Sequence, residues 1–327
     1  MKTKKKLIYI FVLTITACFT ITALAEEKGV DIDQDFTRLR NEFGLPLQQY
    51  KFKGDIKNYE AKFYIDPSIN LNLIVPTLAD KTSQDSATDL AKKTQNPIAD
   101  MVSLPFQYNT YFETGPKGKT QSTLLVQPVI PFSLNDDWNF IARPIIPLMD
   151  QAPLTDAQNR NHGLGNIQFQ GFFSPKEKVG DWIIGFGPYM EFPTNSGPDG
   201  RFGSDNWSAG PAVVALKMEG PWVYGGLLTH LWSYYGNDPE VNLTSFQPFV
   251  NYNLEDGWYL SAAPTITANW SEGDSDNQWT VPIGGGIGKV FHIGKQPVNA
   301  SIRAYHNLQS PRSGADWQLQ FQIQFLF

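Results

Sequence analysis

The sequence predicts an all-β protein: a transmembrane antiparallel β-barrel of the outer-membrane type with about 12 strands. Three observations predict this fold class. Large apolar residues alternate with uncharged polar residues along short segments, short and long connections take turns between these segments, and tryptophans gather at the segment ends. We expect the barrel over residues 101–327, preceded by a signal peptide and a mixed N-terminal extension.

Residues 1–25 have the form of a secretory signal peptide. Four lysines precede an apolar run that closes on small residues at Ala23 and Ala25, and two glutamates follow. This pattern predicts cleavage after Ala25. The alternatives are an uncleaved anchor over Leu7–Ala25 and a lipoprotein cleavage box that ends at Cys18. Threonines dilute the apolar run, and hydrophobic residues continue beyond Cys18, so cleavage is favoured.

The charge of the exported chain argues against a nucleic-acid partner. The chain has 26 Lys and Arg against 32 Asp and Glu, and loss of the four lysines in residues 1–25 leaves 22 basic residues and a net charge of −10. Nucleic-acid binding needs basic surfaces instead. Cleavage also removes the one cysteine, Cys18, so we expect no disulfide bond. We predict no cofactor and no metal site.

The alternation is clearest in two stretches near the C-terminus. In WYLSAAPTITANW, Trp258 to Trp270, the even-numbered residues are mostly large and apolar. In WQLQFQIQFLF, Trp317 to Phe327, glutamine holds every second position up to Gln324. Successive side chains of a strand point to opposite faces, so one face suits lipid and the other suits water. A soluble sandwich usually carries Lys and Glu on its polar face, whereas uncharged amides are typical of a barrel interior.

Twelve such segments follow Met101, an even number as in bacterial outer-membrane barrels. They start near Val102, Thr120, Trp138, Gly163, Asp181, Trp207, Trp222, Val241, Trp258, Trp279, Val298 and Asp316. Short connections such as SLNDDW and NLEDGW alternate with longer ones such as TNSGPDGRFGSDN and SEGDSDN. Such asymmetry is typical of periplasmic turns at one end of a barrel and extracellular loops at the other.

The nine tryptophans mark both ends of the predicted strands. Trp138, Trp182, Trp222 and Trp258 begin strands at the short-turn end, and Trp207, Trp232, Trp270, Trp279 and Trp317 fall at the long-loop end. Indole rings favour the headgroup region of a bilayer. We interpret the tryptophans as two aromatic girdles in contact with outer-membrane lipid and lipopolysaccharide.

The last strand predicts how the barrel closes. In a closed barrel the final strand pairs with the first, and its outward face contacts lipid. Phe321, Ile323, Phe325 and Phe327 share that face. A terminal aromatic there resembles the signal that the barrel insertion machinery reads. We therefore expect that machinery as a partner, and the bacterial outer membrane, reached through the periplasm, as the location.

Several stretches of the sequence resemble those of a known protein family, in the same order along the chain. They include LAKKTQNPIADMVSLPFQ, GLGNIQFQGFFSP and VPIGGGIGKVFHIGKQPVNASIRAYHN. From about Leu90 to Phe327 the chain resembles the outer-membrane barrel family catalogued as MetA-pathway of phenol degradation proteins. The resemblance implies a transporter of small, often hydrophobic or aromatic compounds. It carries over no catalytic residue, and residues 26–89 fall outside it.

Three ionisable residues are predicted to point into the barrel. The alternation places Arg143, Glu191 and Arg303 on the inward faces of their strands. Charged groups at membrane depth are costly unless they are paired or hydrated, so these residues are the candidates for a pore constriction or a solute contact. The alternative is an internal salt-bridge network that fills the barrel.

Prolines inside the strands are unexpected in a closed barrel, because proline cannot donate to a β-ladder. The predicted strands contain Pro128, Pro131, Pro144, Pro147, Pro188, Pro211, Pro248, Pro264 and Pro282. We expect bulges at these positions. The sharper hypothesis is that broken pairing opens a lateral route from the lumen to the membrane for apolar solutes.

Residues 26–100 are more charged and less regular than the barrel. The stretch SATDLAKKTQNP predicts a short helix that begins at Ser86 or Thr88 and ends before Pro97. Because this extension precedes the first strand, we expect it at the periplasmic end. It is either a plug in the barrel mouth or a periplasmic appendage.

Together these observations predict a passive channel or transporter for a small solute, not an enzyme. One alternative is a structural or surface-interaction barrel with a filled lumen. A minor alternative is an outer-membrane lipid hydrolase, which would place His and Ser two residues apart on one strand face. None of the four histidines is followed by serine two residues later.

Overall fold

The computed structural model describes residues 87–115, 117–153, 159–197 and 202–327. The elements are α4 (Ala87–Thr94), β1 (Ser103–Thr114), β2 (Lys119–Val126), β3 (Ile130–Ser133), β4 (Trp138–Gln151), β5 (Asn161–Leu164), β6 (Ile167–Pro175), β7 (Trp182–Phe192), β8 (Trp207–Glu219), β9 (Trp222–Tyr235), β10 (Asn242–Asn253), η3 (Glu255–Gly257), β11 (Trp258–Ala262), β12 (Ile266–Asn269), α5 (Ser275–Gln278), β13 (Trp279–Ile293), β14 (Gln296–Gln309) and β15 (Trp317–Leu326). None of the helices in this part of the chain is long and apolar enough to cross a membrane.

The predicted signal peptide and residues 26–86 of the extension lie outside the described residues. The domain boundaries 1–25, 26–100 and 101–327 therefore stay predictions.

The fifteen strand segments belong to one antiparallel sheet, and they form twelve strands of a barrel wall. Three wall strands consist of two segments each: β2 with β3, β5 with β6, and β11 with β12. The prediction of about twelve strands is confirmed. Strands begin at Trp138, Trp207 and Trp222, as the alternation predicted.

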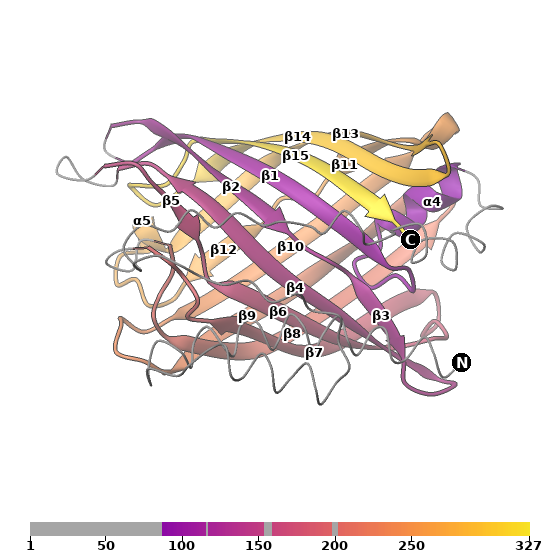
Figure 1. The fold of residues 1–327 in the computed structure, drawn as a ribbon, viewed down its shortest axis with the longest axis horizontal. Coiled ribbons are helices and arrows are strands. Elements are labelled where there is room, and N and C mark those ends of the chain that lie inside the picture. The colour runs from indigo at the N-terminus through magenta and orange to yellow at the C-terminus, as the bar shows by residue number, and fades with distance from the viewer. Residues whose placement is uncertain (1–86, 116, 154–158, 198–201) are drawn as a thin grey trace, which may run out of the picture. The chain divides into compact units, whose positions relative to one another are not determined.

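The wall closes where the chain ends. β15 pairs with β1 from Ser103↔Leu326 to Phe112↔Trp317, and β14 and β2 flank this pair. The strands run obliquely around the closed wall (Figure 1). A closed sheet leaves no edge with unpaired backbone groups, which is the condition for crossing a hydrocarbon layer with strands.

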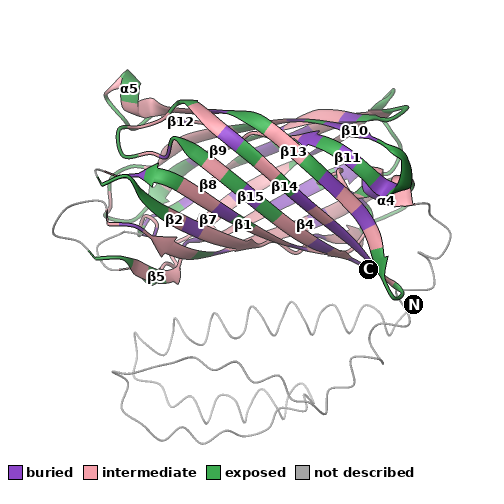
Figure 2. Cartoon of the chain, turned by 90° about the horizontal axis from the view of Figure 1, so that it is seen from above, coloured by how far each residue is buried: buried purple, intermediate pink, exposed green. Residues whose placement is uncertain are grey.

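The two faces of the wall differ in chemistry, as the alternation predicted. Exposed and buried residues alternate along the strands (Figure 2). On the outside, Leu228, Leu260 and Phe321 are 44–50 % exposed. On the inside, Gln320 donates to Asn109 Oδ1 at 3.1 Å and Gln324 donates to Ser103 Oγ at 3.0 Å. The glutamines of the last strand therefore join it to the first strand by side-chain hydrogen bonds inside the barrel, while the apolar residues of the last strand face outward.

The prolines have three structural outcomes. Pro282 lies at a register shift between β13 and β14, which is the expected bulge. The prediction that Pro128 and Pro264 lie within strands is wrong, because they fall in the interruptions between β2 and β3 and between β11 and β12. Proline removes a ladder donor, which explains why the pairing stops there. The bulges expected at the other strand prolines are absent, because their pairing shows no shift of register; Pro188 and Pro211, for example, lie opposite each other in β7 and β8. These prolines are Pro131, Pro144, Pro147, Pro188, Pro211 and Pro248.

The predicted short helix is confirmed as α4, which lies at the short-turn end of the barrel near the C-terminus (Figure 1). Lys92 and Lys93 in its last turn suit the negative end of the helix dipole. Leu90 and Ala91 are fully buried against the inward residues Tyr259 and Val290. Hydrophobic contact thus holds α4 against the inside of the wall.

Candidate functional site in the barrel lumen

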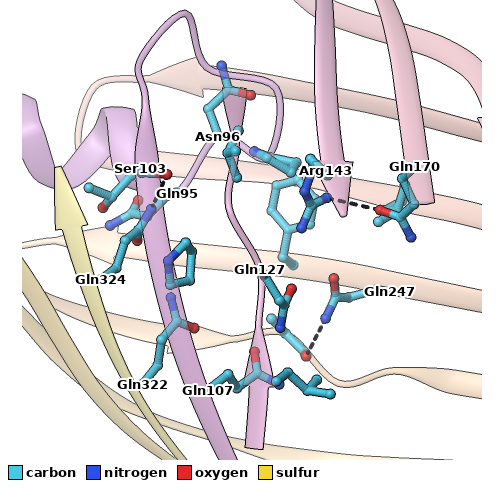
Figure 3. A pocket seen from close by; sticks show the side chains of 18 of the residues that line it. Gln95, Asn96, Ser103, Gln107, Gln127, Arg143, Gln170, Gln247, Gln322 and Gln324 are labelled. Carbon is cyan, nitrogen blue, oxygen red and sulfur yellow. Dashed lines mark hydrogen bonds between the residues drawn. The ribbon is translucent and has the colours of Figure 1, made fainter. Parts of the chain in front are cut away.

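A cavity of about 410 Å³ lies inside the barrel, between the wall and the segment Lys93–Met101, which comprises the end of α4 and the chain that follows it. Side chains from strands far apart in the sequence surround it. Gln107 of β1, Arg143 of β4 and Gln247 of β10 border the same space (Figure 3). This cavity is the candidate functional site.

Amide side chains provide much of the polar lining. Each amide can donate and accept hydrogen bonds without carrying a charge, so it can hold water or a passing polar group. The glutamines of the lining are Gln95, Gln107, Gln127, Gln168, Gln170, Gln247, Gln322 and Gln324.

Arg143 lies on the inward face of β4, near the middle of the strand. Its Nη1 donates to Oε1 of Gln170, on the adjacent strand β6, at 3.3 Å. Its Nε is buried and has no hydrogen-bond partner among the described residues. The register shows why the pair meets, since Arg143 and Gln170 lie directly opposite each other.

Arg303 repeats this arrangement on β14. Its Nη1 donates to Oε1 of Gln320 at 2.7 Å, and Arg303 and Gln320 lie opposite each other in β14 and β15. Its Nε is likewise buried without a hydrogen-bond partner in the described chain. Two arginines therefore line one cavity, each held by a neutral amide.

Glu191 is separate from the two arginines. It points inward near the long-loop end of β7, where Gln168 Nε2 donates to Oε2 at 2.8 Å and Asn166 Nδ2 donates to Oε1 at 3.3 Å. Glu191 is not part of the cavity lining. Of the three predicted residues, the structure brings two together at the cavity, and the role of all three as a constriction stays a prediction.

The described lumen does not contain the alternative salt-bridge network. Among the described residues, no carboxylate lies within ion-pair distance of Arg143 or Arg303, and no basic group lies so near Glu191. The described ion pairs join Arg160 and His162 to Asp150, Lys217 to Asp181 and Glu219, and Arg312 to Asp274. These pairs lie at strand ends and in loops.

One side of the lumen is packed with apolar side chains. Strands β4 to β10 contribute most of a cluster of buried residues, and Ile98 from the segment after α4 and Val129 from between β2 and β3 join it. Ile98 lies over Gly185, where an added Cβ would come within 3.0 Å of its Cδ1. The cluster contains Ile98, Val129, Ile141, Phe172, Tyr189, Ala212, Val214, Leu216, Val223, Leu227, Leu231 and Phe249.

Hydrogen bonds fix the end of α4 to the wall. Gln95 and Asn253 form a reciprocal amide pair, with donor–acceptor distances of 2.9 and 3.1 Å. Asn299 donates to Thr94 Oγ1 at 3.2 Å and accepts from the Tyr259 hydroxyl at 2.7 Å. The segment from α4 to β1 thus narrows the short-turn end of the cavity. The sequence predicted the helix but gave no signal for these cross-barrel contacts.

The wall is not continuously paired beside the cavity. Residues 263–265 belong to no strand, and residues 281–285 of β13 lack a partner on the β11–β12 side. A groove of about 690 Å³ on the wall there is lined by Leu260, Gly285 and neighbouring residues. Ser261 lines both this groove and the lumen cavity. The hypothesis of a lateral route therefore keeps its structural basis at Pro264 and stays a hypothesis.

Solved structures of outer-membrane barrels are similar to this architecture. The crystal structure of the COG4313 outer membrane channel from Pseudomonas putida F1 matches with a TM-score of 0.55 over 69 % of this chain and 94 % of that one, at 14 % identity. The fold is that of a solved outer-membrane channel. At such low identity the likeness concerns the fold alone.

Two further outer-membrane barrels are more distantly similar, with TM-scores below 0.5. The NanC porin matches over 69 % of this chain and 98 % of its own, with a TM-score of 0.44 and 12 % identity. The outer membrane phospholipase A from Escherichia coli matches over 69 % and 95 %, with a TM-score of 0.40 and 13 % identity. No family model matches the chain, and no curated protein matches it.

The predicted girdle residues all lie at strand ends. Trp182, Trp222 and Trp258 begin β7, β9 and β11 and are 41–44 % exposed on the outer face, and Trp138 begins β4. At the other end, the exposed rings are Trp207, Trp232, Trp270 and Trp317, and Trp279 packs against Trp270 at 5.7 Å between ring centroids. Contact with lipid headgroups stays a prediction for them.

The C-terminal residues have the predicted placement. Phe321 is exposed on the outer face of β15, Ile323 and Phe325 are partly buried in the same strand, and Phe327 follows it. The Phe327 backbone N–H donates to the Val102 carbonyl at 2.8 Å, beside the first strand. Recognition of this end by insertion machinery stays a prediction.

One histidine on the outer wall has a hydroxyl neighbour. His230 Nδ1 lies 2.7 Å from Thr244 Oγ1 on the adjacent strand, where Trp270 Nε1 also donates to the same oxygen at 2.8 Å. A pattern of His and Ser on one strand does not detect this contact, because His230 and Thr244 belong to two neighbouring strands.

Proposed function

We propose that the chain is a passive channel of the bacterial outer membrane for small, hydrophobic or aromatic molecules. The observation that carries the proposal is the cavity in the middle of a closed barrel, bordered by amides and two arginines on one side and by apolar side chains on the other. A fully packed barrel would have no such space. The channel fold of the Pseudomonas putida F1 protein supports the proposal.

A finer proposal is that the chain belongs to the family catalogued as MetA-pathway of phenol degradation proteins. This proposal is supported by the amino-acid sequence of the stretches from Leu90 onward, which resemble that family. On this view the solute is a small compound of the kind that a transporter in a degradation pathway would import.

The segment from α4 to β1 acts in this proposal as a partial plug. It is held by the Gln95–Asn253 amide pair, by Leu90 and Ala91, and by Ile98. Movement of this segment would widen the lumen at the short-turn end. Hydrogen bonds between neutral groups contribute about 0.5–1.5 kcal/mol each, so thermal opening of part of the contact set is accessible.

The competing proposal is a structural barrel with a filled lumen, which the packed apolar cluster favours. The two proposals differ in solute flux. Vesicles that contain the refolded mature chain would be diluted into isotonic solutions of neutral solutes of increasing size, with protein-free vesicles as the control. A channel gives swelling that falls with solute size, whereas a filled barrel gives none for any solute.

The same vesicles test for catalysis. We propose no enzymatic activity, and release of fatty acid from the vesicle phospholipid above the protein-free rate would contradict this. A His230→Ala variant with undiminished release would assign such activity to another site.

A further inference from the structure

The charges on the lumen cavity have one sign. Among the described residues, its lining contains the two inward arginines, Arg143 and Arg303, and no aspartate or glutamate. The chain as a whole carries a net charge of −6. The acidic excess therefore lies elsewhere, and the cavity is a positive site inside an acidic protein.

The two arginines lack charge compensation from the described chain. Each uses Nη1 on a neutral glutamine oxygen, and each has a buried Nε without a hydrogen-bond partner among the described residues. A guanidinium has five N–H donors in a planar fork that matches a carboxylate. A partly buried cation without an opposite charge is costly, so an anion in the cavity would lower the free energy of the site.

The rest of the lining indicates what kind of anion fits. Amide side chains such as Gln127 and Gln322 border the same cavity and can donate hydrogen bonds to the oxygen atoms of an anion (Figure 3). Leu125, Leu227 and Phe249 line the same cavity and offer apolar contact. A volume of about 410 Å³ falls within the range of small-molecule sites, about 300–1,000 Å³. A carboxylate attached to a compact apolar body satisfies all three surfaces.

We propose that the lumen cavity binds small organic carboxylates with an apolar body, and that Arg143 and Arg303 provide the anion selectivity. The inference rests on the proposed channel function and narrows its substrate class. Arginine recognises the carboxylate by hydrogen bonds and charge, and the apolar side of the lumen holds the body of the solute. Neutral molecules of the same shape bind more weakly.

The first test measures selectivity in planar bilayers that contain the full mature chain. Under a gradient of KCl, the reversal potential of the wild type should show preference for chloride. Arg143→Gln combined with Arg303→Gln should abolish this preference. Arg312→Gln is the matched control, because Arg312 is exposed in a loop and pairs with Asp274 outside the lumen. Cation preference in the wild type, or unchanged chloride preference in the double variant, would overturn the proposal.

The second test uses benzoate as the probe and benzamide as its neutral counterpart. Benzoate should reduce the chloride current of the wild type, and its half-blocking concentration should rise about tenfold or more in the double variant, since hydrogen bonds to charged groups are the strong ones. Benzamide should block weakly and equally in both. Arg→Lys at both positions should keep the chloride preference but lose part of the benzoate block, because lysine lacks the planar fork. Equal benzoate block in the wild type and the Gln variant would refute the assignment.

A binding measurement separates this inference from the channel proposal. Ligand that binds only the folded barrel raises its melting temperature, whether or not the barrel conducts. Benzoate should raise the temperature at which the folded band disappears in gel electrophoresis for the wild type, and not for the double variant. If no variant conducts and benzoate still stabilises the wild type, the channel fails and the carboxylate site stands. If the barrel conducts and benzoate has no effect in either test, the carboxylate site fails alone.

Discussion

Gly288 offers a sharp test of how the wall holds α4 in place. It lies on the inward face of β13, next to the ring of Tyr259. A Cβ at this position would come within 2.7 Å of Tyr259 Cε2 and closer still to Cζ and Oη. Gly288→Ala therefore requires the Tyr259 ring to move away from the wall.

The size of the effect follows from these contacts. Ordinary Cβ contacts begin near 3.4 Å, so the ring must retreat by more than about 0.7 Å. Overpacking of a closely packed site costs about 1–3 kcal/mol. Loss of the hydrogen bond from the Tyr259 hydroxyl to Asn299 adds about 0.5–1.5 kcal/mol. We expect Gly288→Ala to lower the free energy of unfolding by about 2–4 kcal/mol.

The same displacement should loosen the plug, because Leu90 and Ala91 of α4 pack against Tyr259. Two measurements follow: urea unfolding of the barrel in lipid vesicles, monitored by tryptophan fluorescence, and single-channel conductance. Gly273→Ala is the matched control, since nothing lies within 4 Å of an added Cβ in that loop. We expect lower stability and higher conductance for Gly288→Ala than for the control. Equal stability and conductance of the two variants would refute the placement of Tyr259 and its support of α4.

Three further predictions concern the packed cluster, the plug and the C-terminus. Phe172→Ala should lower the free energy of unfolding by about 3–5 kcal/mol because Phe172 is fully buried in the lumen cluster. Phe173 lies on the outer face and is 38 % exposed, so Phe173→Ala should cost clearly less in the same urea titration. Equal losses would contradict the assignment of faces. Gln95→Ala with Asn253→Ala removes the reciprocal amide pair and should increase conductance in planar bilayers, whereas unchanged current would show that this pair does not hold the plug. Deletion of residues 325–327 should reduce the heat-modifiable folded band in outer-membrane fractions, because the predicted insertion signal and part of the β1–β15 pairing are lost. Full assembly would refute the role of this end.

The barrel wall was predictable because its signal repeats. Alternation sets the face of each residue, and Trp138, Trp207 and Trp258 mark strand starts, so the strand count and the closing pair followed from the sequence. The interruption at Pro264 was missed as a boundary because the alternation continues in phase across residues 263–265. Proline chemistry pointed to this position, but only the pairing pattern shows that the strand stops.

The site was predictable in part. Alternation placed Arg143 and Arg303 inside, but it does not tell whether two inward residues of distant strands border one space. The contact between Leu90 and Tyr259 depends on how the chain before the first strand folds back into the barrel, which no local pattern encodes. The contact between His230 and Thr244 depends on strand register, which periodicity alone leaves open.

Ion conductance of the refolded mature chain in planar bilayers tests the central claim most directly. If the lumen is a passive path, the wild type carries stepwise currents that follow the applied voltage without any energy source, and the Gln95→Ala, Asn253→Ala variant carries larger ones. Absence of current from both proteins, with the folded band intact in gel electrophoresis, would contradict the claim that this barrel is a channel.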